Sequence, residues 1–387
     1  MKKFIFSKSL LKQSLPTLLF SLLSLSLAGK WLDESLSESL YVKYPLMLIS
    51  SCILTFKGNI ELILAMHLST LSQSRNLDLS KYHRFAFDNS CLVITQSVFI
   101  GLMIGILGGI KNFLSKDVDI NIIIKIMASV LVSCFFSTVC ILLIMVVSIK
   151  LSLLFNIDPD HIVLPGISSF GDFFGVRTCT YFIKYFHFAT PQISAIVILL
   201  ILLITIIPFY FSLVSKKIIP QQTIEVLLLT YLLSASAGYI LDFFSKNFKI
   251  LAIYEPVFCG MCCSTVLIYL NKRVTSIENR AEMNNQKVFS TLLLISFSLG
   301  AIYMIFFLFF INKFLLSFFL LFVALFTLNI FILLYFIKLI IDSNSIANPN
   351  IGVFAIPLIS SLSDFTGVLM SIFIILCVSL LQVSFLD

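Results

Sequence analysis

Long apolar segments follow one another along almost the whole chain of 387 residues. A helix needs about 20 apolar residues to cross the hydrocarbon core of a bilayer. Segments of about that length lie near residues 14–31, 44–71, 88–110, 121–154, 162–186, 191–214, 223–244, 250–271, 288–311, 314–341 and 355–385. Only helices and closed barrels satisfy the backbone inside lipid, so this pattern predicts an all-α polytopic membrane protein with about 11 transmembrane helices.

The composition excludes several other classes of protein. Hydrophobic residues make up 59% of the chain and charged residues 12%, against about 45–50% and 25% in soluble domains. The net charge of +7 comes without a basic run, so we expect cationic loops and no nucleic-acid partner. No zinc-protease, G-x-S-x-G or phosphate-loop pattern occurs, and we expect no enzyme activity.

The nine cysteines suggest no redox compartment, because most of them lie in apolar stretches. Cys259, Cys262 and Cys263 have a C-x-x-C-C spacing that could hold a soft metal. No partner cluster occurs elsewhere in the sequence. We therefore expect these thiols to behave as small buried hydrophobic groups.

Loop charges predict the orientation in the membrane. With the N-terminus in the cytoplasm, cytoplasmic loops and the N-terminal lysines carry 15 Lys and Arg, against 8 on the opposite side. This asymmetry follows the positive-inside rule, and an odd number of spans then places Asp387 outside. The first span lacks a small-residue cleavage site, so we expect it to be retained. Either the plasma membrane or an internal membrane fits this pattern.

Two stretches of the chain repeat each other. Pro165–Val176 reads PGISSFGDFFGV, and Pro357–Val368 reads PLISSLSDFTGV. Eight of the twelve positions are identical at an offset of 192 residues. Shared Pro, Ser-Ser, Asp and Gly in one register indicate an internal duplication.

The duplication predicts a division of the chain. We expect five-helix repeats in residues 1–190 and 223–387, joined by a linker transmembrane helix within 191–222. Five is an odd number, so one extra span keeps the repeats parallel, related by an axis along the membrane normal. A single chain would then work as a monomer with pseudo-twofold symmetry.

Asp172 and Asp364 are the candidate functional acids. Each lies seven residues after its motif proline, or about 10 Å along a helix that begins there. A carboxylate inside a membrane costs about 2.5–3.5 kcal/mol and is by default a functional candidate. Ser168, and Ser360 in the second copy, precede the acids by four residues and share their helix face.

Parallel repeats would bring the two aspartates to opposite walls of one cavity. Such a cavity suits Mg²⁺, which prefers oxygen ligands and is held through one or two carboxylates with several waters retained. Alternatively, each aspartate only bonds to a neighbouring helix, or Arg177 neutralises Asp172.

The second apolar segment holds three polar residues, Lys57, Asn59 and Glu61, in LTFKGNIELILAMHLST. Lys57 and Glu61 are spaced i, i+4, so they could neutralise each other. Otherwise Glu61 is a further candidate ligand. Asn59 is not explained by that pair, and its amide oxygen is a candidate for lining the same pathway.

LTFKGNIELILAMHLST resembles the segment around the L-K-G-N-L-E motif of solute carrier family 41. The paired P-x-x-S-x-x-D-like stretches resemble the signature that this family shares with bacterial MgtE magnesium transporters. The segment EPVFCGMCCS is similar to the family's P-V-x-x-G-x-G-G-N, with Cys262, Cys263 and Ser264 in place of Gly, Gly and Asn. The resemblance implies two fused MgtE-like units whose motif aspartates, here Asp172 and Asp364, line an ion path.

We therefore expect a transporter or channel for divalent cations, most of all Mg²⁺, in the lipid bilayer. The ion is a transported substrate, and we expect no cofactor; a coupling ion is left open. The alternative is a non-transporting scaffold or regulatory membrane protein with a degenerate pore, because of Arg177 and the missing second-half Asn.

Overall fold

The computed structural model describes residues 8–38, 43–72, 79–114, 120–155, 159–215, 222–278, 284–310, 316–344 and 351–381, and contains no strand within them. The helices in chain order are α1 (Lys8–Ser37), α2 (Leu46–Cys52), the π-helical turn η2 (Ile53–Lys57), α3 (Gly58–Ser72), α4 (Leu79–Leu114), α5 (Ile120–Leu154), α6 (Pro159–Phe188), α7 (Pro191–Val214), α8 (Gln222–Ser245), α9 (Leu251–Glu278), α10 (Asn285–Phe310), α11 (Leu316–Asn344) and α12 (Ile351–Leu381).

Each predicted apolar segment corresponds to one helical segment, and the second contains α2, η2 and α3 in succession. In the described part of the chain, ten helical segments are long and apolar enough to cross a membrane. The remaining one, α6, has 30 residues but carries Arg177, Lys184 and His187. The prediction of an all-α polytopic membrane protein is confirmed.

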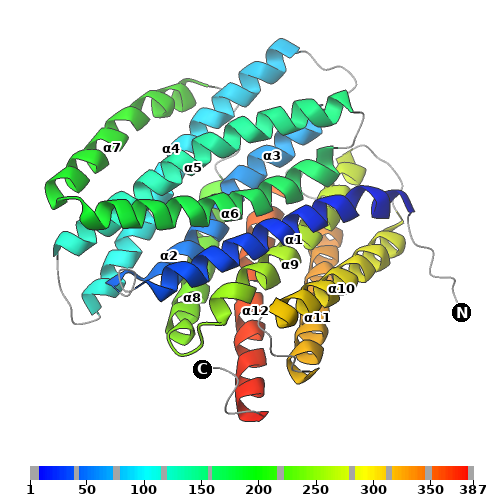
Figure 1. The fold of residues 1–387 in the computed structure, drawn as a ribbon. Helices are drawn as coiled ribbons and strands as arrows, with labels where there is room; N and C mark the ends of the chain where they lie inside the picture. Colours follow the sequence, from blue (N-terminus) through cyan, green and yellow to red (C-terminus); the bar gives the residue numbers. More distant parts are fainter. Residues whose placement is uncertain are drawn as a thin grey trace, which may run out of the picture.

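The helices form a bundle around two central segments. Figure 1 shows α4, α5, α6 and α1 lying side by side. Helix α4 contacts α5, α5 contacts α6, and α6 contacts α1. Helix α9 and the segment α2–η2–α3 are almost wholly buried, whereas α7 packs on α4 and α5 and is mostly exposed. The polar residues of the two central segments are therefore shielded from lipid.

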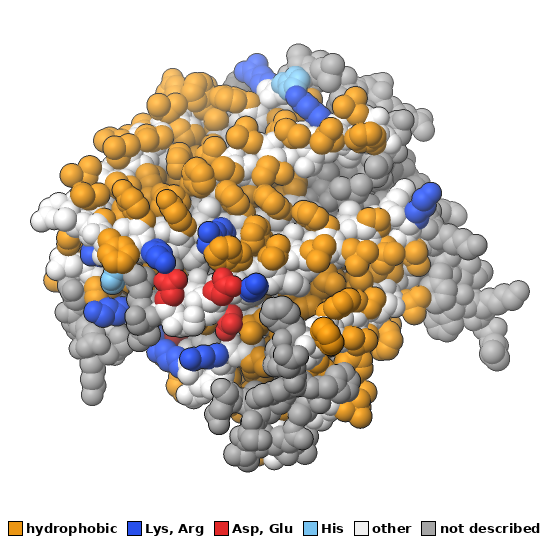
Figure 2. All heavy atoms as spheres, viewed as in Figure 1, with side chains coloured by type: hydrophobic (Ala, Val, Ile, Leu, Met, Phe, Trp, Pro, Cys, Tyr) orange, Lys and Arg blue, Asp and Glu red, His pale blue; other side chains and the backbone are white. Residues whose placement is uncertain are grey.

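Much of the visible surface is hydrophobic. Figure 2 shows apolar side chains spread across the helices, with charged side chains gathered toward the ends. Helix α7 contributes exposed Leu and Ile side chains along its length. Such a surface suits contact with lipid chains between two polar interfaces.

Helix pairs of the first half, α1–α6, recur in the second half, α8–α12. Helix α5 packs on α4 and α6, as α11 packs on α10 and α12. Between the halves, α1 packs on α9 while α8 packs on α2, and α6 packs on α9 while α12 packs on α3. The predicted repeat boundaries stay a prediction, and residues 216–221 of the predicted linker lie outside the described residues.

Glycines allow close contacts between the halves. A Cβ on Gly29 of α1 would lie 2.0 Å from the carbonyl oxygen of Ile253 in α9. A Cβ on Gly238 of α8 would lie 3.1 Å from the carbonyl oxygen of Leu48 in α2. Small residues let membrane helices approach backbone to backbone, so both crossings depend on a missing side chain.

Candidate cation site

Asp172 and Asp364 occupy matching places in α6 and α12. The helices begin at Pro159 and Ile351, so each aspartate lies 13 residues after the first helical residue. At about 1.5 Å per residue this is roughly 20 Å along the helix, near its middle. The expected distance of about 10 Å from the start of each helix was too small, because both helices begin six residues before the motif prolines.

Both aspartates line one cavity of about 40 Å³ at the centre of the bundle. At roughly 10–15 Å³ for each water, this space holds a few water molecules. Asn59, Ser168 and Ser360 also line the cavity, so five of the six candidate residues meet there. Its walls come from α1, α2–η2–α3, α6, α9 and α12.

Two hydrogen bonds join α12 to the second apolar segment at this cavity. The hydroxyl of Thr55 donates to the Oδ2 atom of Asp364, and the hydroxyl of Ser360 donates to the Oδ1 atom of Asn59. The Nδ2 atom of Asn59 is buried without a partner among the described residues. Because a hydroxyl both donates and accepts, turning the amide over keeps the bond to Ser360 and leaves Oδ1 as a free acceptor.

The π-helical turn η2, Ile53–Lys57, places Thr55 beside Asp364. A π-helical turn holds more residues than an α-helical turn and changes the direction of the side chains that follow. Such turns occur often at functional sites. No residue pattern in the segment marks this turn in the sequence.

Glu61 lies beside the main cavity. Its Oε1 atom lies 2.6 Å from Lys57 Nζ and accepts a hydrogen bond of 2.8 Å from Thr138. The ion pair lines a smaller adjoining space of about 10 Å³, whose wall includes Asp172 and Ser168. The structure thus shows the mutual neutralisation that the i, i+4 spacing allowed.

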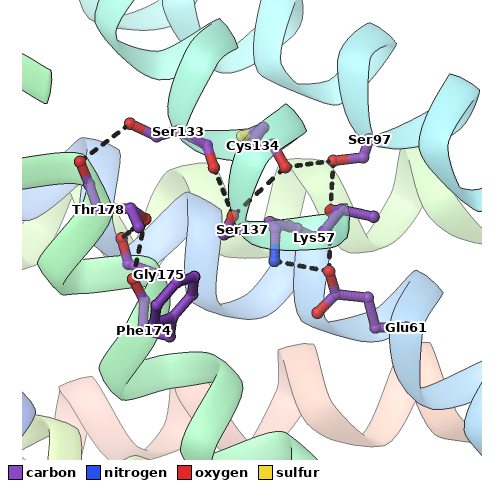
Figure 3. A network of polar contacts seen from close by, with 10 residues as sticks. Lys57, Glu61, Ser97, Ser133, Cys134, Ser137, Phe174, Gly175 and Thr178 are labelled. Carbon is purple, nitrogen blue, oxygen red and sulfur yellow. Dashed lines mark hydrogen bonds and ion pairs between the residues drawn. The ribbon is translucent and has the colours of Figure 1, made fainter. Parts of the chain in front are cut away.

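Figure 3 shows this ion pair in a wider polar network. Thr138 also bonds to Ser97 of α4 at 2.7 Å, and Ser97 donates to the carbonyl oxygen of Cys134 at 3.1 Å. Ser133 of α5 donates to the carbonyl oxygen of Thr178 in α6 at 3.4 Å. The network joins α3, α4, α5 and α6, so it fixes the helix that carries Asp172.

Arg177 does not neutralise Asp172 in the structure. Its guanidinium carbon lies 3.4 Å from the centroid of the Trp31 ring in α1, a cation–π contact. The side chain is exposed and does not line the cavity. The cavity wall contains no Lys or Arg among the described residues.

Glu255 of α9 is a cavity residue that the sequence analysis missed. It is 7% exposed and lines the same cavity as the two aspartates. A signal was present, because Glu255 is an acid within an apolar segment, the same feature that singled out the aspartates.

The three clustered cysteines do not converge. Cys259 and Cys263 line the cavity, whereas the sulfur of Cys262 lies 3.5 Å from the Nδ2 atom of Asn329 in α11. No group of three His, Cys, Asp or Glu side chains is placed to hold a metal ion directly within the described residues. An ion in the cavity would therefore keep part of its water shell.

The fold and the cavity define a multi-pass helical membrane protein with an acidic internal site. Residues 50–183 match the family model MgtE, described as a divalent cation transporter. The chain is also similar to solute carrier family 41 member 3 from Rattus norvegicus, with 24% identity over 57% of this chain and 50% of the relative. For the Mus musculus protein of the same name, the identity is 23% over 60% of this chain and 49% of the relative.

These matches confirm the resemblance of the chain to the MgtE family and to solute carrier family 41. It spans about half the length of these curated relatives. The MgtE match contains Asn59, Glu61 and Asp172, while Asp364 lies beyond it. No solved structure matches the chain.

Proposed function

We propose that this protein carries divalent cations, most of all Mg²⁺, across a membrane through the cavity between its two halves. The observation that carries the proposal is the pair Asp172 and Asp364, both half-buried, on the wall of one cavity. Neither aspartate forms an ion pair with a described Lys or Arg. Placing uncompensated carboxylates inside a membrane protein is costly even when they are half-buried, and a bound cation offsets that cost.

The chemistry of the wall favours Mg²⁺ as the substrate. Carboxylate, amide and hydroxyl oxygens from Asp172, Asp364, Asn59, Ser168 and Ser360 are hard ligands. The space admits a few waters, and Mg²⁺ is commonly held through one or two carboxylates while it keeps several waters. The description of the matching family model, a divalent cation transporter, supports the same class of ion.

The reciprocal packing of the halves supports two parallel repeats, residues 1–190 and 223–387, around this site. In this arrangement α7 is the linker that keeps them parallel. The N-terminus is cytoplasmic, as the loop charges require. One chain then supplies both halves of the site and works as a monomer.

A non-transporting scaffold is the second candidate function. The observation that favours it is Ser264, which replaces the family's second-half Asn and whose hydroxyl is buried without a partner among the described residues. Arg177 was the other reason for this alternative. It no longer supports a degenerate pore, because its side chain lies against Trp31, away from the cavity.

Reconstitution tests the proposal. Liposomes that contain the purified chain and an internal magnesium-sensitive dye should show Mg²⁺ influx down a gradient. The Asp172→Asn, Asp364→Asn double variant removes both charges while keeping side-chain size, and we expect at least a tenfold loss of influx. Folding is checked by the melting temperature in detergent.

Gradients of calcium, cobalt and sodium measured in the same liposomes define the selectivity. Influx at the wild-type rate through the double variant would show that Asp172 and Asp364 do not form the cation site. A folded wild-type protein that carries none of these ions would favour the scaffold.

A further inference from the structure

We propose that Glu255 is a third carboxylate of the cation site, supplied by the second half alone and acting on the ion through its water shell, since no three such side chains ligate a metal directly within the described residues; this inference rests on the proposed transport function. Its side chain lies on α9, which is almost wholly buried, and lines the cavity together with Asp172 and Asp364. The wall thus holds three acids and, among the described residues, no basic side chain.

A comparison of two buried glutamates separates this role from a structural one. Glu61 is 3% exposed and is compensated by Lys57 at 2.6 Å and Thr138 at 2.8 Å. Glu255 is 7% exposed and has no ion pair among the described residues. The thiol of Cys259, one helical turn later, lies beside it, and its sulfur also lies 3.8 Å from the carbonyl oxygen of Asp364. A thiol is a weak donor and does not replace a cation.

The cavity gives an independent sign of a polar occupant. Asn59 is 1% exposed and lines the same wall, yet one atom of its amide has no partner within the described residues. A buried polar group without a protein partner in a space large enough for water indicates ordered water or an ion. The uncompensated Glu255 and the unpaired amide of Asn59 therefore lie around one polar space.

The first half offers no matching acid. Asn59 and Ser264 occupy corresponding positions that are 205 residues apart. At the same offset, the first-half position that corresponds to Glu255 is Ser50, which precedes Ser51. Both carry hydroxyls, and Ser50 donates to the carbonyl oxygen of Met47 at 3.1 Å. The site is thus asymmetric, with two acids from the second half and one from the first. The extra negative charge favours a divalent over a monovalent cation, because the attraction grows with ion charge.

The test measures initial Mg²⁺ influx into liposomes over a concentration series, at matched protein levels, for Glu255→Gln and Glu255→Asp. We expect Glu255→Gln to raise the half-saturating Mg²⁺ concentration about tenfold or more, and Glu255→Asp to lie between that variant and wild type. The matched control is Asp242→Asn, because Asp242 is a buried acid of α8 that pairs with Lys111 away from the cavity. It should keep the wild-type concentration dependence.

A second readout follows the melting temperature of the detergent-purified full chain. Mg²⁺ should stabilise the wild type, since a ligand that binds only the folded state raises its stability. Glu255→Gln should melt higher than wild type without Mg²⁺, because a buried charge is removed, and should gain less when Mg²⁺ is added. A purely structural Glu255 predicts the reverse, a lower melting temperature and an unchanged gain.

Cys259→Ala distinguishes charge from the thiol hydrogen bond. If this variant reproduces the shift of Glu255→Gln, Glu255 acts through its bond to Cys259 and the inference is overturned. Wild-type influx together with wild-type behaviour of Glu255→Gln also overturns it and leaves the transport function intact. Absence of influx from the wild type would instead refute the transport function itself.

Discussion

Asp172 and Asp364 have different neighbours despite their matching places in α6 and α12. Asp364 accepts a hydrogen bond from Thr55. The residue 205 positions after Thr55 is Gly260, which has no side-chain donor, and a Cβ there would lie 2.5 Å from Leu25. At the residue scale the two acids are therefore solvated differently, with Asp364 more firmly held.

Asn59 and Ser264 provide a prediction at this scale. Asn59 lines the cavity and Ser264 is not among the cavity residues. Asn59→Ala should raise the half-saturating Mg²⁺ concentration several-fold, because an amide oxygen is a better acceptor for a hard cation or its water than a hydroxyl. Ser264→Ala should change it little.

Influx measured over a concentration series at matched protein levels decides between the two residues. Equal, small effects would make Asn59 a helix-packing residue. A larger loss in Ser264→Ala would contradict the asymmetry.

At the scale of elements, close helix crossings position the site. Helix α1 reaches α9 at Gly29, and α8 reaches α2 at Gly238. Gly175 and Gly367 lie three residues after the two aspartates. Gly175 lies against Leu54, and Gly367 lies against Cys259. The π-helical turn lies between these crossings, so small changes in helix separation act on the hydrogen bond between Thr55 and Asp364.

Gly29→Ala should destabilise the protein, because the new methyl group would overlap the carbonyl of Ile253. Overpacking of this kind costs about 1–3 kcal/mol. The matched control is Gly166→Ala, since nothing lies within 4 Å of a Cβ at Gly166 in α6. This control should be neutral or stabilising by about 0.5–1 kcal/mol, because Ala favours helix over Gly. Melting temperatures in one detergent compare the two; equal values would mean that α1 does not pack closely on α9.

At the scale of the whole molecule, two parallel halves require both motif helices to enter from one side. Single cysteines at Asp160 and Asn350 should label with a membrane-impermeant reagent from the cytoplasmic side, and a cysteine added after Asp387 from the other side. Most natural cysteines are buried, and the partly exposed Cys140 and Cys377 are replaced first. Labelling of the first two positions from opposite sides would refute the parallel arrangement.

The sequence by itself determined the helices, the membrane and the duplicated acids. Apolar length fixes where a helix can cross lipid, because the backbone must bond within itself there. The cost of an acid inside such a helix singled out Asp172 and Asp364 before any packing was known. Helix packing then brings five of the candidate residues to one cavity.

Only the tertiary structure decided which polar groups are compensated. Lys57 satisfies Glu61, and the Trp31 ring holds Arg177 away from Asp172, whereas Glu255 faces the aspartates without a cation. Each outcome depends on which helix lies opposite and at what rotation, and the π-helical turn changes that rotation locally. Sequence spacing gives the face of one helix, but the balance between desolvation and pairing is set by the neighbour across the contact.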